Sequence, residues 1–92
     1  MFRMYGKLVK SNKILADHVV EITDLSMTRT AKVYAALDEI CHRFDLAKPI
    51  WLPSNKEQFI RSASTRFTSD NFIESIEFDY LQFQVLEEEF YV

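Results

Sequence analysis

Apolar residues recur with helical spacing in the middle of the chain. The recurring positions, at steps of mostly three or four residues, are Val33, Leu37, Ile40, Cys41 and Phe44. This spacing places them on one face of a helix, with the charged residues of the segment on its other sides. The pattern predicts one amphipathic helix over residues 30–46. Its start stays open, because three N-cap residues compete: Asp24, Ser26 and Thr28.

The first 23 residues alternate between apolar and polar positions, which is typical of half-buried strands. The expected apolar face holds Phe2, Met4 and Leu8 in a first strand over 2–10, and the even positions of a second strand over 14–23. Polar residues 11–13 between them indicate a hairpin loop, so the two strands are expected to pair antiparallel. Gly6 is expected where a side chain would crowd a neighbour.

A capping box follows Pro53. The Ser54 hydroxyl and the Glu57 carboxylate have the spacing to accept from each other's backbone N–H groups. This predicts a second, short helix over about 55–64, whose apolar face holds Phe59, Ile60 and Ala63. Ahead of it, Ile50 and Trp51 are expected to cover one end of the core.

The last third of the chain has the alternating pattern of β structure, but the apolar residues switch from even to odd positions within it. Residues 64–68 have the pattern of a short strand, and 69–71 that of a turn. Apolar residues then occupy even positions (Ile76, Phe78, Tyr80) before switching to odd ones (Leu81, Phe83, Val85). One regular strand cannot bury both sets on one face. We expect either one strand over 72–87 with a bulge near Asp79 and Tyr80, or two strands.

These elements predict a single α+β domain over residues 1–92. The expected order is strand, strand, helix, helix, an optional short strand and a last strand. The sheet is expected to be antiparallel, with three or four strands and both helices packed on one face.

Charge is distributed unevenly along the chain. All eleven Lys and Arg residues lie in residues 1–66, which carry a net charge of +4. Residues 67–92 contain seven acidic residues and no Lys or Arg, which gives −7. The chain therefore has an acidic C-terminal end.

The single cysteine, Cys41, cannot form an intrachain disulfide, whereas a secreted domain of this size usually carries several. We therefore expect a reducing, cytoplasmic location, with Cys41 as a small buried residue rather than a reactive thiol. The alternating N-terminus does not resemble a signal peptide, and no apolar run approaches the length of a membrane span.

The chain resembles a group of small bacterial proteins of unknown function, in the segments TRTAKVYAALDEICHRFDLAKPIWL and TRFTSDNFIESIEFDYLQFQVLEE. The resemblance covers nearly the whole chain and includes no catalytic motif. It implies a small intracellular bacterial protein, and no functional residue is carried over from it.

Three candidate pairs for chemistry each have a simpler explanation. Glu39 and His42 have the spacing of half a di-iron site, but the chain has no second such pair, and a solvated helix face explains them. Cys41 and His42 are neighbours on a helix and point about 100° apart, so they do not form a nucleophile–base pair. Cys41 with His18 across the core is conceivable, and a packed thiol beside a histidine is the simpler interpretation. We expect no enzyme, no cofactor and no metal site.

Two charged surfaces remain as candidates for interaction. Arg3, Tyr5 and Lys7 alternate onto one face, as in basic surfaces that bind nucleic acid. The simpler interpretation is internal pairing of Lys7 and Lys10 with acidic residues of the last strand, among Glu74, Glu77 and Glu87. The acidic residues Glu87, Glu88 and Glu89 indicate either a mimic of a phosphate backbone or, more simply, a solubilising edge.

Phe90, Tyr91 and Val92 follow this acidic run, and exposed apolar residues are unusual there. We expect them to fold back onto the core, to continue the last strand or to bind a second copy. The sequence thus favours a non-enzymatic interaction or regulatory module that self-associates as a homodimer or binds another protein. A nucleic-acid-linked role is the alternative.

Overall fold

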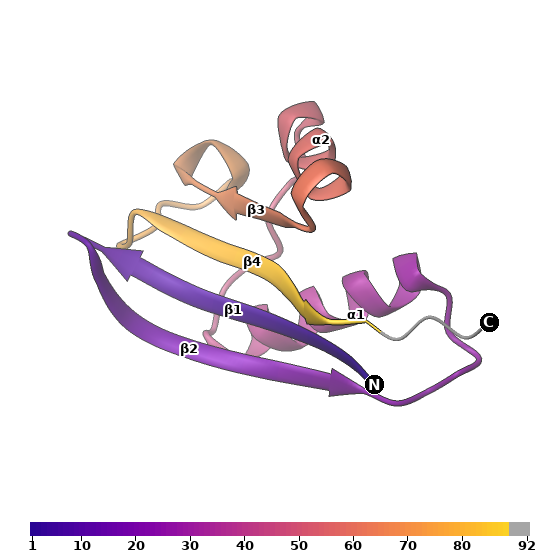
Figure 1. Cartoon of the computed structure of the whole chain (residues 1–92). Helices are drawn as coiled ribbons and strands as arrows, with labels where there is room; N and C mark the ends of the chain where they lie inside the picture. The colour runs from indigo at the N-terminus through magenta and orange to yellow at the C-terminus, as the bar shows by residue number, and fades with distance from the viewer. Residues whose placement is uncertain (89–92) are drawn as a thin grey trace.

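One antiparallel sheet and two helices make up the fold in this computed structural model, which describes residues 1–88 (Figure 1). The strands are β1 (Phe2–Lys10), β2 (Lys13–Ile22), β3 (Ser64–Phe67) and β4 (Tyr80–Glu87). The helices are α1 (Arg29–Arg43) and α2 (Pro53–Ser62), with a short 3-10 turn at Ser69–Asn71. The strand order is β2-β1-β4-β3. This confirms the predicted α+β class, and it places the first strand, β1, beside the last strand, β4.

A two-residue loop joins β1 and β2. Lys10 lies opposite Lys13, and the intervening Ser11 and Asn12 have φ angles of 51° and 64°. Two consecutive residues with positive φ are what a tight hairpin turn with the right-handed twist of the strands requires. The predicted hairpin is confirmed.

Both helices lie on the same face of the sheet, because their buried residues join one core with the inward-facing strand residues. That core includes Met4 of β1, Val20 of β2, Phe67 of β3, Leu81 and Phe83 of β4, Val33, Leu37 and Ile40 of α1, and Phe59 of α2. The residues predicted to face inward from β1, Phe2, Met4 and Leu8, join or contact this core, as do Val20 and Ile22 of β2. At the hairpin end the alternation breaks down, because the register shifts between Leu8 and Val9, Val9 is buried, and Ile14 is 55% exposed. Within residues 1–88, no helix lies on the opposite face of the sheet.

Local capping sets the ends of α1. The Thr28 hydroxyl accepts a hydrogen bond from the Ala31 N–H at 3.1 Å, which decides among the three competing N-caps. The helix ends at Arg43, three residues earlier than predicted. Asp45 takes a φ of 56°, and the Leu46 N–H donates back to the Cys41 carbonyl. This is a left-handed helix end that satisfies the last carbonyls.

Gly6 lets α1 approach the middle of the sheet. A Cβ atom added to Gly6 would lie 2.7 Å from Ile40 Cγ2 and 2.9 Å from Ile40 Cδ1. Ile40 itself is fully buried. The expected crowding at Gly6 is therefore confirmed, and its neighbour is the central helix.

The start of α2 differs from the prediction. Pro53 occupies its first turn, where the missing N–H is harmless, and Leu52 is the N-cap. The Leu52 N–H donates to Asn55 Oδ1 at 3.1 Å, so Asn55 takes the role predicted for Glu57, and Ser54 lies inside the helix. The predicted Ser54–Glu57 box is wrong because the helix starts two residues earlier than expected, with Asn55 as the capping partner.

The apolar face predicted for α2 is also partly wrong. Phe59 is buried, but Ile60 is 86% exposed. In the preceding connector, Trp51 packs edge-to-face against Phe59 and Phe67, as expected of a residue covering the core, whereas Ile50 is 48% exposed.

The phase change in the last third marks the start of a strand. Residues 64–67 form β3 as predicted, and β4 begins only at Tyr80. Residues 72–79 are irregular, with Phe72 and Phe78 packed edge-to-face and buried. Neither a single bulged strand over 72–87 nor two strands is present, because Ile76 and Phe78 pack against the core from a loop and Tyr80 is the first residue of β4.

Substituting Gly6→Ala tests the contact with α1. We expect a loss of about 1–3 kcal/mol in the free energy of unfolding, measured by urea denaturation, because the added methyl group overpacks the site. In an Ile40→Ala background, which removes the opposing atoms, the loss is expected to shrink. An equal loss in both backgrounds would show that Ile40 is not the constraint.

Substituting Asn55→Ala tests the start of α2. The side chain is 4% exposed and makes four hydrogen bonds, with Leu52, Thr65, Arg66 and Asn71. Without this side chain, its buried partners lose their hydrogen bonds. We therefore expect a loss of about 1–3 kcal/mol in the free energy of unfolding, measured by urea denaturation. The neighbouring Ser54→Ala is the control, with an expected change within about 0.5 kcal/mol. A larger loss for Ser54→Ala than for Asn55→Ala would contradict this capping arrangement.

Candidate functional site

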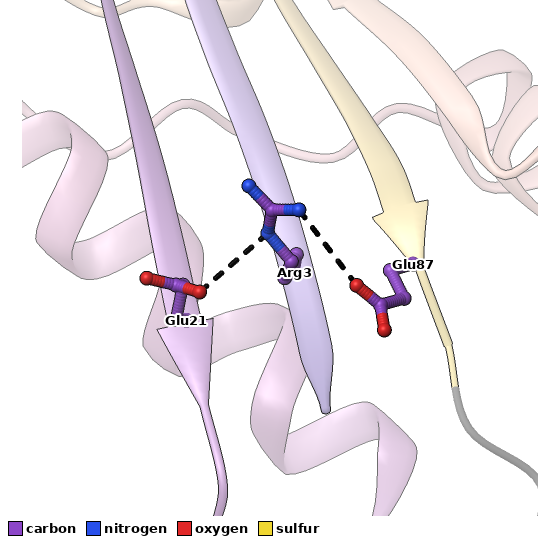
Figure 2. Close-up of polar contacts among 3 residues, drawn as sticks. All are labelled: Arg3, Glu21 and Glu87. Atoms are coloured by element: carbon purple, nitrogen blue, oxygen red, sulfur yellow. Dashed lines mark ion pairs between the residues drawn. The ribbon is translucent and has the colours of Figure 1, made fainter.

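Arg3 lies between two carboxylates on the face of the sheet that α1 does not cover (Figure 2). Strand register places it opposite Glu21 of β2 and Glu87 of β4. Its Nε is 3.6 Å from Glu21 Oε2, and its Nη1 is 3.7 Å from Glu87 Oε2. Cross-strand pairing of Glu87 thus occurs, but with Arg3 rather than with Lys7 or Lys10.

Tyr5 and Lys7 follow Arg3 along this open face. The Tyr5 hydroxyl donates to Asp17 Oδ2 at 2.8 Å. Burial raises the pKa of Tyr5 above its ordinary value, and the bond to Asp17 raises it further. Lys7 lies in register between Asp17 of β2 and Gln82 of β4. The sequence-predicted basic residues therefore share a face, but acidic residues are interspersed among them.

A second polar cluster on the open face involves Arg66, which sequence reasoning did not single out. The Arg66 guanidinium lies 4.4 Å from the centroid of the Tyr80 ring, and its Nε donates to Gln82 Oε1 at 3.0 Å. Gln82 in turn donates to Ser64 Oγ. Only the register of β3 against β4 brings these residues together, so no spacing in the sequence indicates the cluster.

The outer edge of β2 is a different kind of surface. β2 is ten residues long and pairs only with β1 among the described strands. Ile14 and Leu15, near its start, are each 55% exposed. The exposed carboxylates of the strand, Asp17 and Glu21, are already engaged by Tyr5 and Arg3.

An apolar groove of about 240 Å³ lies between α1 and α2. Its lining includes Val33, Tyr34, Trp51, Phe59 and Ile60, with the cations Arg29 and Lys56. The Arg29 guanidinium lies 5.5 Å from the Phe59 ring centroid and forms an ion pair with Glu88. Tyr34 is 47% exposed and Trp51 half-buried, so part of this aromatic surface is open. No pattern in the sequence indicates this groove, because its lining comes from α1, α2 and the connector between them, and the helical spacing predicts Ile60 as a core residue.

The titratable residues of the central helix are separated in the fold. Glu39 pairs with His18 of β2, whose Nε2 lies 2.9 Å from Glu39 Oε2, and not with His42, which is exposed. Cys41 is 2% exposed, and burial raises the pKa of its thiol to about 11. Among residues 1–88, no three His, Cys, Asp or Glu side chains are grouped so as to hold a metal ion.

The acidic end is only partly described. Glu87 pairs with Arg3, and Glu88 with Arg29. Glu89, Phe90 and Tyr91, the remaining residues of the predicted interaction surface, lie outside the described residues.

Comparisons with known proteins identify no relative. No protein-family model, curated protein or solved structure matches the chain. The resemblance to small bacterial proteins therefore stays a prediction. In the described part of the chain, no helix combines the length and the apolar character needed to cross a membrane.

Proposed function

We propose that this protein is a non-enzymatic interaction module that self-associates through the outer edge of β2. The observation that carries the proposal is a ten-residue edge strand without a second strand partner among residues 1–88, bordered by the exposed side chains of Ile14 and Leu15. At about 3.3 Å per residue, this edge extends over roughly 33 Å. Its free N–H and C=O groups are a template for another strand.

The other edge of the sheet is a weaker candidate. β3 has four residues, and α2 packs beside it. Short or covered edges are the common way in which proteins prevent strand pairing. On β2, by contrast, Asp17 accepts a hydrogen bond from Tyr5 and Glu21 forms an ion pair with Arg3, both on the open face of the sheet. These carboxylates therefore do not block the pairing of another strand with the edge of β2.

A second copy of the chain is the partner that fits this edge. Antiparallel pairing of two β2 strands about a two-fold axis satisfies the main-chain groups of both copies at once. It also joins the two sheets into one. The exposed side chains of Ile14 and Leu15 would then be partly covered.

The alternatives have less support from the geometry. Arg3 is flanked by two carboxylates and Tyr5 donates to a third, which weakens the open face as a nucleic-acid surface. Glu87 and Glu88 are paired with arginines of the same chain, which leaves fewer free carboxylates for a phosphate mimic. As part of the proposal, we assign the protein to a reducing, cytoplasmic environment, supported by its single, buried cysteine.

The double variant Ile14→Lys/Leu15→Lys tests the proposal. Lysine on an edge strand disfavours pairing with another chain, and both positions are exposed, so the fold is expected to persist. At concentrations where the wild-type protein sediments as a dimer, we expect the double variant to sediment as a monomer.

Ile73→Lys is the matched control, since Ile73 is 89% exposed and lies in the irregular segment 72–79. It is expected to leave the dimer intact. A wild-type protein that stays monomeric at every concentration, or a double variant that dimerises like the control, would refute self-association through β2.

A further inference from the structure

We propose that a polar pocket beside α2 binds a small polyhydroxylated molecule that carries a phosphate group, and that Arg66 binds the phosphate. The pocket has a volume of about 410 Å³ and lies where α2, β3 and β4 meet. β3 is the edge of the sheet opposite to β2 (Figure 1), so the inference goes beyond the proposed self-association. The lining consists of Gln58, Ser62, Ser64, Thr65, Arg66 and Gln82.

The guanidinium of Arg66 is held in place by its neighbours. It lies 4.4 Å from the centroid of the Tyr80 ring, and its Nε donates to Gln82 Oε1 at 3.0 Å. Gln82 is only 9% exposed, and its amide donates to Ser64 Oγ, which fixes the orientation of the amide. The guanidinium is thus oriented before a ligand arrives, which reduces the conformational entropy that is lost on binding.

The two Nη groups of Arg66 remain available for an anion. Among residues 1–88, neither of them has a hydrogen-bond or ion-pair partner. A guanidinium in this state binds phosphate or carboxylate through two parallel, charge-assisted hydrogen bonds. Of the described residues that line the pocket, none is acidic. Asp70 lines a neighbouring pocket together with Arg66, but in the described chain it forms no ion pair with it.

Further donors in the pocket favour phosphate over carboxylate. Gln58 accepts from Thr65 through Oε1, so its Nε2 group has no partner within the described part of the chain. Ser64 accepts from Gln82 and keeps its own hydroxyl proton to donate. Together with the Nη groups of Arg66, these donors match the three terminal oxygens of a phosphate monoester better than the two oxygens of a carboxylate.

The lining indicates what the rest of the ligand is. As far as the structure describes it, the pocket has no apolar or aromatic side chain in its lining, so it offers no surface for an aliphatic tail or a nucleobase. Its volume is within the roughly 300–1,000 Å³ of small-molecule sites, which leaves room beyond the phosphate itself. Amide and hydroxyl side chains suit the hydroxyl groups of a sugar or polyol, because both partners donate and accept.

The end of α2 places the phosphate within the pocket. α2 ends at Ser62, and the last carbonyl groups of a helix carry partial negative charge. These carbonyl groups disfavour an anion and accept hydrogen bonds from hydroxyl groups. The phosphate is therefore expected at Arg66, with the hydroxyl groups of the ligand toward Ser62.

Titration of the full ¹⁵N-labelled chain with glucose 6-phosphate, followed by NMR, tests the site. All titrations are made at constant ionic strength, because salt screens exposed charges. We expect saturable shifts of the Arg66 Nε–H signal and of the side-chain amide signals of Gln58 and Gln82. Inorganic phosphate is expected to shift the Arg66 signal with lower affinity, and glucose to cause no shift at the same concentrations.

Substitutions at Arg66 test its assignment to the phosphate. Because its side chain is exposed, the variants are expected to unfold at the wild-type urea midpoint. Arg66→Gln is expected to weaken binding of glucose 6-phosphate by about tenfold or more, since charge-assisted hydrogen bonds are lost. Arg66→Lys keeps the charge without the bidentate geometry and is expected to restore binding only in part. Arg43→Gln removes an exposed arginine of α1 outside the pocket, and as the control it is expected to bind like the wild type.

Three other outcomes would overturn parts or all of the proposal. If neither glucose 6-phosphate nor phosphate causes saturable shifts, or if Arg66→Gln binds like Arg43→Gln, the site does not exist. Phosphate that binds as tightly as glucose 6-phosphate would rule out a polyhydroxylated ligand. Glucuronate that binds more tightly than glucose 6-phosphate would contradict the choice of phosphate over carboxylate.

Discussion

The close approach of Ile40 to the backbone of Gly6 is the constraint on which this structure depends. β1 is an inner strand of the sheet, paired with β2 and β4, so whatever packs against its middle sets the distance between helix and sheet. A side chain at position 6 would push α1 outward, because a Cβ atom there would meet Ile40 at under 3 Å. The absence of that side chain lets α1 bury five residues against the inner face: Val33, Ala36, Leu37, Ile40 and Cys41.

The packing of α1 and α2 on one face of the sheet determines which surfaces of the sheet stay uncovered. Two helices on one face leave the other face of the sheet open, where polar and charged side chains satisfy one another across strands. α2 packs beside β3, so the long edge of β2 is the larger unpaired backbone surface among the described strands. The apolar groove forms where α1 and α2 meet. The β2 edge proposed for self-association and the α1–α2 groove thus both lie at the border of the packed core.

The fold was largely predictable because its main signals are local. Strand alternation over 2–10, the hairpin loop and the helical spacing after Thr28 each involve residues close in the sequence. The errors arose where a distant contact decides the outcome. Ser54 and Glu57 match a capping box, but Asn55 is held by Thr65 and Asn71 and sets the helix start. Phe78 belongs to an alternating pattern that predicts a strand, but it lies in a loop and packs against Phe72.

The candidate surfaces were less predictable for the same reason. Arg3, Tyr5 and Lys7 were assigned to one face correctly, yet their acidic neighbours come from β2 and β4, and only the register reveals them. Arg66 and the α1–α2 groove were missed altogether, since each depends on residues from separate elements.

Hydrogen exchange of the β2 backbone amides at several protein concentrations tests the central claim most directly. If β2 pairs with a second copy, its outward-facing amides exchange slowly at high concentration and faster on dilution, whereas the amides of β1 and β4 keep their rates. Exchange of the β2 amides at the same rate across all concentrations would contradict the claim that this edge is the surface through which the protein acts.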